Sequence, residues 1–415
     1  MQPYDMKELE ERVILVGVQE SFSEDVEESL DELAELCETA GALVVGRVIQ
    51  NREKIHPGTY VGKGKIEEIA LLMEELGATG IVCDDELSLA QLNNLEKELD
   101  CKVMDRTLII LDIFAARANT SEGNIQVELA QLRYRAARLV GLRNSLSRLG
   151  GGIGTRGPGE KKLEMDRRLI HARISQLKAE LAQVQKHREL IRSKRKKDQM
   201  VVAAIVGYTN AGKSTLLNTL TDAGVLEEDK LFATLDPTTR LLELPGGQNI
   251  LLTDTVGFIR KLPHHLIEAF KSTLEEAKYA DIIIHVVDAS NPQKEKQMHV
   301  VYETLKDLGV KDQPILTLFN KQDRIENPEI LKDMKADKTL KISAKTGQGL
   351  DDLKDELEKI LRARSILLER VFPYEKAGLI QIVRAKGQLL EEEYRGDGIY
   401  VKAFVPAEIY GKVAY

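Results

Sequence analysis

The sequence predicts an α/β multidomain protein in which two strand-and-helix domains flank a long helical hairpin and a small α+β domain follows. The 415-residue chain exceeds the size at which one hydrophobic core stops growing. Apolar runs alternate with helix-like segments on both sides of the middle section. The middle section instead repeats apolar residues at steps of three and four, the spacing of a helix seam. We expect four parts: 1–118, 119–197, 198–364 and 365–415.

The composition is typical of a soluble globular protein, with 43% hydrophobic and 30% charged residues. No apolar run reaches about 18 residues, so we expect no membrane span. The N-terminus lacks the basic and apolar regions of a signal peptide. Cys37, Cys83 and Cys101 show no metal-ligand spacing, and their odd number argues against a disulfide framework. We therefore expect reduced thiols in a cytoplasmic protein, which we take to be a monomer.

The first 118 residues alternate between short apolar runs and helical patterns, which indicates a small α/β domain with a largely parallel sheet. The stretch GKGK at 62–65 opens a helix and would suit an anion. Because it lacks the full phosphate-loop pattern, we favour an ordinary helix start. We expect strands at Val13–Val18, Leu43–Ile49, Gly80–Cys83 and Lys102–Met104, and helices at Glu24–Thr39, Lys65–Leu76, Ser88–Leu99 and Thr107–Ala118.

The middle section carries two helix seams separated by a glycine-rich interruption. Neither seam is broad enough to bury itself, which predicts an antiparallel, coiled-coil-like hairpin. The sequence GGGIGTRGPGE at 150–160 cannot continue a helix, so we expect it to form the tip loop. The seams run through Leu129, Leu132, Ala136, Leu139 and Leu146, and then through Ile170, Ile174, Leu177, Leu181, Val184 and Ile191.

The net charge of −8 conceals a strong asymmetry along the chain. Residues 1–130 contain 11 Lys/Arg against 28 Asp/Glu, whereas residues 131–197 contain 19 against 5. A basic hairpin beside an acidic domain is the electrostatic footprint of a nucleic-acid partner, although many charged hairpins are merely solvated. Tip glycines would admit RNA phosphates closely, and basic side chains would give salt-sensitive affinity. The expected RNA contacts are Arg148, Gly151, Gly152, Gly154, Arg156, Gly157, Lys161 and Lys162.

A phosphate-loop pattern follows an apolar strand at the start of the second α/β domain. The segment GYTNAGKS at 207–214 matches G-x-x-x-x-G-K-[ST] and leads into a helix. Lys213 would neutralise the β- and γ-phosphates, and the Ser214 hydroxyl would bind Mg²⁺. The pattern predicts a nucleoside triphosphate held by Gly207, Tyr208, Thr209, Asn210, Ala211, Gly212, Lys213, Ser214 and Thr215.

Two later motifs favour guanine as the base. NKQD at 320–323 follows the expected strand Ile315–Phe319, and SAKTG at 343–347 follows Leu340–Ile342. A carboxylate at Asp323 accepts hydrogen bonds from N1 and N2 of guanine, and adenine offers neither donor. The backbone N–H of Ala344 would meet the guanine O6. The expected base contacts are Asn320, Lys321, Asp323, Ser343, Ala344 and Lys345.

Switch elements lie between these motifs. In DTVG, which follows the expected strand Ile250–Thr253, Asp254 would hold Mg²⁺ through water and the Gly257 N–H would meet the γ-phosphate. In FATLDPTTR at 232–240, Thr234 is the expected hydroxyl that binds Mg²⁺ only when the γ-phosphate is present. Thr238 and Thr239 compete with it for this role. The predicted nucleotide contacts here are Asp254, Thr255, Val256 and Gly257, and the predicted catalytic residues are Lys213, Thr234 and Gly257.

Phe258 follows DTVG at the position where many such GTPases carry a glutamine that orients water. Intrinsic hydrolysis is therefore expected to be slow and to need help from elsewhere. The amide of Asn210 would suit a monovalent cation such as K⁺ beside the phosphates, and an ordinary loop amide is an equal alternative.

The last fifty residues contain two strand-like runs, Gly378–Arg384 and Gly398–Val405. The segment Glu391–Asp397 separates them. They predict a small α+β domain.

The sequence resembles the HflX family of ribosome-associated GTPases over nearly its whole length. The resemblance is carried by GYTNAGKST, FATLDPTTR, GGGIGTRGPGE and the long segment DTVGFIRKLPHHLIEAFKSTLEE at 254–276. It implies a P-loop GTPase core that binds the large ribosomal subunit and splits stalled or idle ribosomes under stress. It also implies that the hairpin tip approaches ribosomal RNA of the peptidyl-transferase region. Phe258 follows the family pattern.

Two other functions remain compatible with parts of the sequence. A signalling switch would act through a protein effector, with the acidic N-terminal domain as its working surface and no RNA. An ATP-driven RNA-remodelling enzyme is disfavoured, because Asp323 selects guanine. We favour a ribosome-binding GTPase in which GTP orders the switch loops and GDP favours release.

Overall fold

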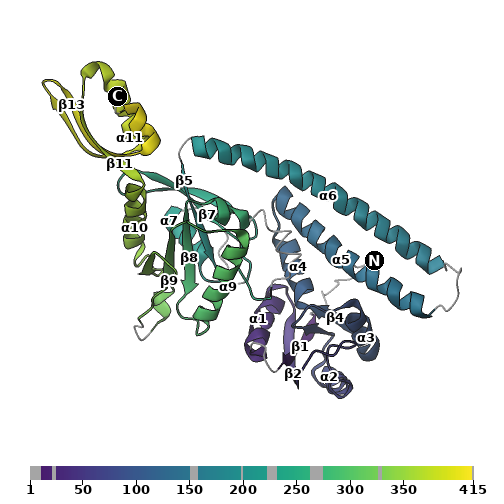
Figure 1. Ribbon diagram of the computed structural model, residues 1–415. Helices are drawn as coiled ribbons and strands as arrows, with labels where there is room; N and C mark the ends of the chain where they lie inside the picture. The colour runs from purple at the N-terminus through teal and green to yellow at the C-terminus, as the bar shows by residue number, and fades with distance from the viewer. Residues whose placement is uncertain are drawn as a thin grey trace, which may run out of the picture. The chain divides into compact units, whose positions relative to one another are not determined.

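The computed structural model describes residues 11–20, 25–149, 158–197, 200–221, 231–261, 274–325 and 330–413 (Figure 1). By their contacts these residues form two compact units. The first unit falls within 1–186, 228–236 and 260–272, and the second within 187–227, 237–259 and 273–415. No helix in the described ranges is long and apolar enough to cross a membrane.

The first unit contains a four-stranded parallel sheet with the strand order β2-β1-β3-β4. The first strand, β1, lies inside this sheet, with β2 on one side and β3 followed by β4 on the other. This order places a topological switch point at the carboxyl ends of β1 and β3. The strands are β1 Arg12–Glu20, β2 Leu43–Arg52, β3 Gly80–Cys83 and β4 Lys102–Asp105, so all four predicted strands are confirmed.

Four helices connect and follow these strands, and side chains cap the starts of three of them. The Asp25 side chain accepts from the Glu27 N–H at the start of α1. Ser88 and Gln91 form a capping box on α3, and Asp105 caps α4. The GKGK stretch is the start of α2, as expected, with Gly62 as its N-cap. The helices are α1 Val26–Thr39, α2 Lys63–Leu76, α3 Leu89–Leu99 and α4 Arg106–Arg117.

Two long helices, α5 Ser121–Leu149 and α6 Pro158–Lys197, run side by side (Figure 1). Their shared core includes Leu129 and Leu177, and a bidentate Arg173–Glu128 pair at 2.7 and 2.8 Å joins them. The hairpin prediction is confirmed. The tip boundary was wrong by three residues, because α6 already begins at Pro158: proline is tolerated in the first helical turn, where its missing N–H has no intrahelical partner.

The second unit is built on a six-stranded sheet with the order β10-β9-β8-β5-β7-β6, in which only the edge strand β6 is antiparallel. The carboxyl ends of the parallel strands therefore meet at one edge of this sheet. Its strands are β5 Val201–Gly207, β6 Thr238–Glu243, β7 Asn249–Asp254, β8 Ile282–Asp288, β9 Ile315–Asn320 and β10 Lys338–Lys341. The helices described beside them are α7 Lys213–Thr221, α9 Lys294–Leu308, α10 Leu350–Ala363 and the short 3-10 helix η1 Gln322–Arg324.

The C-terminal part is a three-stranded antiparallel sheet with two helices. The predicted strand Gly378–Arg384 is wrong, because this segment lies inside α11. Ile380 and Val383, three residues apart, share one helix face and are buried in the core of this sheet. The predicted separator at 391–397 mostly belongs to a strand. The elements are β11 Ser365–Phe372, η2 Tyr374–Lys376, α11 Ala377–Lys386, β12 Gln388–Arg395, β13 Gly398–Pro406 and α12 Ala407–Val413.

Candidate functional site

The predicted site lies in the second unit, where β5, β7, β8 and β9 end along one edge of the sheet. Open parallel sheets bind ligands outside the carboxyl ends of their strands. The loop that leaves β5 at Gly207 enters α7 at Lys213, so its residues precede a helix N-terminus, a position that favours phosphate. β7 delivers Asp254 and β9 delivers Asn320 to the same edge.

Two positions of this loop must be glycine, because other residues of the protein lie too close to leave room for a side chain. A side chain on Gly207 would place its Cβ 2.2 Å from the Val286 carbonyl oxygen, and one on Gly212 would come within 2.3 Å of Asn320 Nδ2. Gly212 also has φ +95°, which is unfavourable for other residues. Asn210 has φ 59°, a left-handed conformation that asparagine tolerates. This conformation accounts for an asparagine at 210 independently of any cation.

Lys213 is buried, and its ammonium donates to the backbone carbonyl of Tyr208 at 2.7 Å. Burial lowers the pKa of Lys213 to about 8, although the nearby Asp254 opposes this shift. Gly257 lies against the same loop, because a Cβ there would meet Thr209 Cα at 2.9 Å and Lys213 Nζ at 3.0 Å. The structure therefore brings two of the three predicted catalytic residues together.

The Ser214 hydroxyl donates to Asp254 Oδ2 at 2.8 Å, which joins the start of α7 to the end of β7. Asp254 is fully buried. Thr255, the next residue, donates from its hydroxyl to the Ile205 carbonyl at 2.8 Å, and Val256 is buried. These contacts fix the DTVG segment against β5, beside the phosphate loop.

The guanine motifs meet through Asn320. Its Nδ2 donates to the Ala211 carbonyl at 2.9 Å, and its Oδ1 accepts from the Ala344 N–H at 2.8 Å. This N–H, which we expected at the guanine O6, thus also braces the site internally.

Asp323 lies beside the second guanine motif. Its Oδ1 accepts from the Ser343 hydroxyl at 2.6 Å, and this bond lowers the pKa of Asp323. Lys321 pairs with Asp288 at the end of β8 at 2.8 Å. Thr215 is partly exposed on α7, and Lys345 is exposed.

Known proteins resemble this chain along its whole length. Three family models match consecutive segments: GTP-binding GTPase N-terminal over 27–115, GTP-binding GTPase middle region over 117–195 and 50S ribosome-binding GTPase over 202–321. A GTPase HflX from Lacrimispora saccharolytica is 69% identical, with 99% of this chain and 97% of that protein covered. The chain belongs to the HflX family of GTPases.

A second HflX protein, from Escherichia coli, is 43% identical, with 84% of this chain and 83% of that protein covered. A crystal structure of a GTP-binding protein from Sulfolobus solfataricus in complex with GDP is 25% identical and covers 84% of this chain and 98% of that one, with a TM-score of 0.45. The resemblance to HflX proteins seen in the sequence is confirmed, and so is the assignment of the chain as a GTPase.

Phe258 has a structural role in this HflX chain that its place after DTVG did not predict. Its backbone N–H donates to the Gly207 carbonyl at 3.1 Å, and its carbonyl accepts from the Thr209 N–H at 2.8 Å. Its ring is buried. Phe258 thus ties the DTVG segment to the phosphate loop, a role that its apolar character, read only as the lack of a glutamine, did not suggest.

Thr234 is assigned to the other unit. The segment 231–236 belongs by its contacts to the first unit, whereas the phosphate loop belongs to the second. The role of Thr234 therefore stays a prediction. Among its competitors, Thr239 contacts the Thr253 hydroxyl at 3.0 Å within the sheet of this HflX protein.

The predicted RNA contacts fall at the hairpin tip. Arg148 lies on α5, and Lys161 and Lys162 lie on α6. The tip residues Gly151, Gly152, Gly154, Arg156 and Gly157 lie outside the described residues.

Proposed function

We propose that this HflX GTPase binds the large ribosomal subunit in its GTP form and splits stalled or idle ribosomes under stress, with GDP favouring release. One observation carries the switch part of the proposal. The phosphate loop, the DTVG segment and the base-recognition motifs converge at one edge of a single sheet. The match of residues 202–321 to a family of 50S ribosome-binding GTPases supports the ribosomal partner. We propose a cytoplasmic monomer with the four-part division 1–118, 119–197, 198–364 and 365–415.

The nucleotide would be held by the predicted contacts in three roles. Lys213 neutralises the β- and γ-phosphates, and its buried position strengthens that interaction. The Gly257 N–H contacts the γ-phosphate. Asp323 pairs with guanine, while Asn320 keeps the base-binding segments in place through its contacts to Ala211 and Ala344.

Mg²⁺ fits the donors at the start of α7 and the end of β7. A hydroxyl from Ser214 and a carboxylate from Asp254 are oxygen ligands of the kind that Mg²⁺ prefers, and their contact at 2.8 Å supports a shared ion. Within the described ranges no group of three or more His, Cys, Asp or Glu side chains could hold a metal. Mg²⁺ would accordingly take its remaining ligands from phosphate and water, with Thr234 added in the GTP state. When bound it neutralises charge on the phosphates.

Potassium is proposed as an activating ion bound through the Asn210 amide. Phe258 cannot orient water, so charge stabilisation by a monovalent cation would partly replace the missing glutamine. GTP turnover in K⁺ salts should exceed turnover in Na⁺ salts at equal ionic strength. Equal rates, or an Asn210→Gly variant with unchanged K⁺ dependence, would remove this part of the proposal, because glycine keeps the left-handed backbone and lacks the amide oxygen.

The hairpin is proposed as the RNA-binding element. Residues 131–197 carry 19 Lys/Arg against 5 Asp/Glu, and the helical pair gives this charge a rigid support. Folded RNA is recognised largely through its backbone and shape, which suits basic side chains around a glycine-rich tip.

The test is GTP turnover with and without purified large ribosomal subunits at fixed salt. We expect strong stimulation in the natural chain. Reversing three charges near the tip, Arg156→Glu, Lys161→Glu and Lys162→Glu, should remove most of it. A matched control reverses three exposed charges farther along α6, at Lys178, Lys186 and Lys194.

Three outcomes are informative. Stimulation lost in the tip variant and retained in the control supports the ribosomal role. Stimulation equally reduced in both variants indicates a non-specific charge effect and contradicts the tip as the contact. No stimulation of the natural chain leaves the GTPase intact and favours a protein effector at the acidic N-terminal domain.

A further inference from the structure

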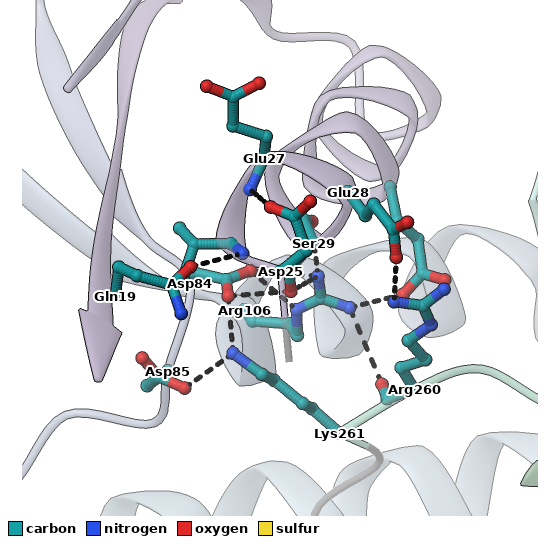
Figure 2. Close-up of polar contacts among 12 residues, drawn as sticks. Gln19, Asp25, Glu27, Glu28, Ser29, Asp84, Asp85, Arg106, Arg260 and Lys261 are labelled. Atoms are coloured by element: carbon teal, nitrogen blue, oxygen red, sulfur yellow. Dashed lines mark hydrogen bonds and ion pairs between the residues drawn. The ribbon is translucent and has the colours of Figure 1, made fainter. Parts of the chain in front are cut away.

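The first unit contains a cluster of buried charges at the carboxyl end of β3. Asp84 follows this strand and Arg106 begins α4, and both are 1% exposed. Arg106 donates to Asp84 Oδ1 from Nη2 at 2.9 Å and to the Ser29 carbonyl at 2.8 Å (Figure 2). It also pairs with Glu32 at 2.5 Å. The cluster lies at the switch point of the sheet, where α/β proteins usually bind a ligand.

The part of this cluster that comes from residues 25–106 has an excess of negative charge. It contains four carboxylates and one cation, Arg106. We call these carboxylates the acidic cluster: Glu28, Glu32, Asp84 and Asp85. Asp84 is buried and the other three carboxylates are partly buried, so this excess of negative charge is stabilised by further cations.

The compensating cations come from a segment more than 150 residues later. Lys261 Nζ contacts Asp84 Oδ2 at 2.5 Å and Asp85 Oδ1 at 2.7 Å. Arg260 Nη1 lies 3.5 Å from Glu28, and the Arg260 carbonyl accepts from Arg106 Nη1 at 3.5 Å. Figure 2 shows both side chains directed at the acidic cluster. Burial alone would raise the pKa of Asp84, but Arg106 and Lys261 outweigh it and lower the pKa.

Arg260 and Lys261 lie in the sequence shortly after the DTVG segment of the nucleotide site. Arg260 follows Gly257 by three residues, and Gly257 lies beside Lys213 and Thr209 of the phosphate loop. The intervening Phe258 is hydrogen-bonded to that loop through Gly207 and Thr209. One short segment, 257–261, therefore has its beginning at the γ-phosphate position proposed above and its end in the acidic cluster.

The cluster also touches the base of the hairpin. Asp105, the neighbour of Arg106, is fully buried and accepts from Tyr134 of α5 at 2.8 Å and from Arg138 of α5 at 2.6 Å. Charged contacts thus run from Lys261 through Asp84 to Arg106, and the adjacent residue Asp105 continues the path to the hairpin through Tyr134 and Arg138.

Residues 231–236 make an independent contact with the same unit. The Asp236 carboxylate accepts from the backbone N–H groups of Asn119 and Thr120 at 3.0 and 2.9 Å, just before α5 begins. Phe232 packs edge-to-face on Phe114 of α4, with ring centroids 4.7 Å apart. Segments from both switch regions are therefore held where α4 meets α5.

We propose that the acidic cluster couples the nucleotide state to the N-terminal unit. In this proposal Lys261 is the positioning residue whose ion pairs with the cluster depend on that state. The proposal rests on the switch role given above to Gly257. When the γ-phosphate is lost and the Gly257 contact is released, the hold of Lys261 on Asp84 and Asp85 changes, and the change reaches α5 through Arg106 and Asp105.

The experiment is hydrogen exchange of the full chain, saturated with GDP or with a non-hydrolysable GTP analogue. In the natural chain we expect amides of 84–91 and 106–112 to exchange at different rates in the two states. Lys261→Met should abolish this difference, whereas Lys261→Arg should retain it. Asp85→Asn, at a partly exposed position, is a second variant that should weaken it. Lys311→Met changes an exposed lysine elsewhere and serves as the control.

A nucleotide-dependent difference that persists in Lys261→Met would overturn the proposal, as would a natural chain that shows no difference at 84–91 although 254–258 responds. If 254–258 also fails to respond in fully saturated protein, the switch role of Gly257 itself is wrong. Affinities for GDP and the analogue, measured on the same samples, verify saturation, and ribosome stimulation tests the ribosomal role separately.

Discussion

Two buried cations of this HflX GTPase are held in opposite ways. Lys213 in the phosphate loop donates to a backbone carbonyl, and burial lowers its pKa to about 8. Arg106 in the first unit is also subject to burial, which would lower its pKa, but Asp84 and Glu32 outweigh burial and raise the pKa. The surrounding protein therefore satisfies the charge of Arg106 and leaves much of the charge of Lys213 for a ligand.

This difference separates a binding cation from a structural one. A cation that binds a ligand interacts most strongly with it when few anions of the protein lie nearby. The shortage of internal anions lowers the stability of the ligand-free protein. A structural cation needs its anions inside the fold, because an unpaired buried charge is strongly destabilising. The two kinds of site should respond oppositely to neutralisation.

The largest expected effect is on catalysis at Lys213. Lys213→Met should lower GTP turnover by about 10²–10³-fold, because the charge that stabilises the phosphates is lost. Stability of the nucleotide-free protein should not fall, because a poorly compensated buried charge disappears. Single-turnover hydrolysis and denaturant unfolding measure the two quantities, with Lys311→Met as the exposed control. A clear loss of stability in Lys213→Met would show that the charge of Lys213 is compensated within the fold.

Arg106→Met should do the reverse. Asp84 would keep a buried carboxylate that had lost its main partner, which costs about 3–5 kcal/mol of unfolding free energy in the first unit. Affinity for GDP should change little. Unfolding of the full chain, followed by hydrogen exchange in β3 and α4, tests this, with exposed Arg135→Met as the control. An unchanged exchange rate would show that the ion pairs contribute little.

Asp323→Ala tests the contact that the base-recognition motif makes with guanine. Removing a charged hydrogen-bond acceptor should weaken GTP binding by about 1.5–3 kcal/mol, roughly 10–100-fold. Exposed Asp312→Ala should leave GTP binding intact. Direct titration with fluorescent GTP and ATP measures both variants. Loss of GTP affinity without loss of preference over ATP would contradict the role of Asp323 in base selection.

The smallest effect is a pH dependence. The pKa of Lys213 is about 8 in the fold against an ordinary 10.5, so the unfolded chain binds more protons between these values. Stability of the nucleotide-free natural chain should therefore rise with pH across this window relative to Lys213→Met, by roughly 1–2 kcal/mol. Unfolding free energies at pH 7.5 and 9.5 check this. A difference that stays flat with pH would mean that the Lys213 charge is well compensated.

Local patterns predicted much of this molecule. Alternation of apolar and helical segments located the strands of the first sheet. Motif spacing placed Asp254 and Asn320 at strand ends and Lys213 at a helix start, and these positions converge in the structure. The strand predicted at 378–384 was wrong, because the apolar residues of this segment suit both a strand and a helix. The packing of Ile380 and Val383 in the core favours the helix.

Long-range pairing could not be predicted. Lys261 and Asp84 are 177 residues apart, and neither lies in a spacing that signals the other. The charge counts revealed an acidic N-terminal part but could not tell solvated carboxylates from the buried ones around Arg106. In the sequence, Phe258 indicated only that the usual glutamine is absent. Its backbone hydrogen bonds to the phosphate loop depend on the folded sheet and could not be predicted.

The most direct test of the central claim is single-turnover GTP hydrolysis with purified large ribosomal subunits added or omitted. The proposed ribosomal role of the basic hairpin predicts strong stimulation of the natural chain, which disappears when residues 150–159 are deleted. Equal rates with and without subunits, at saturating GTP and low salt, would contradict a ribosome-activated switch.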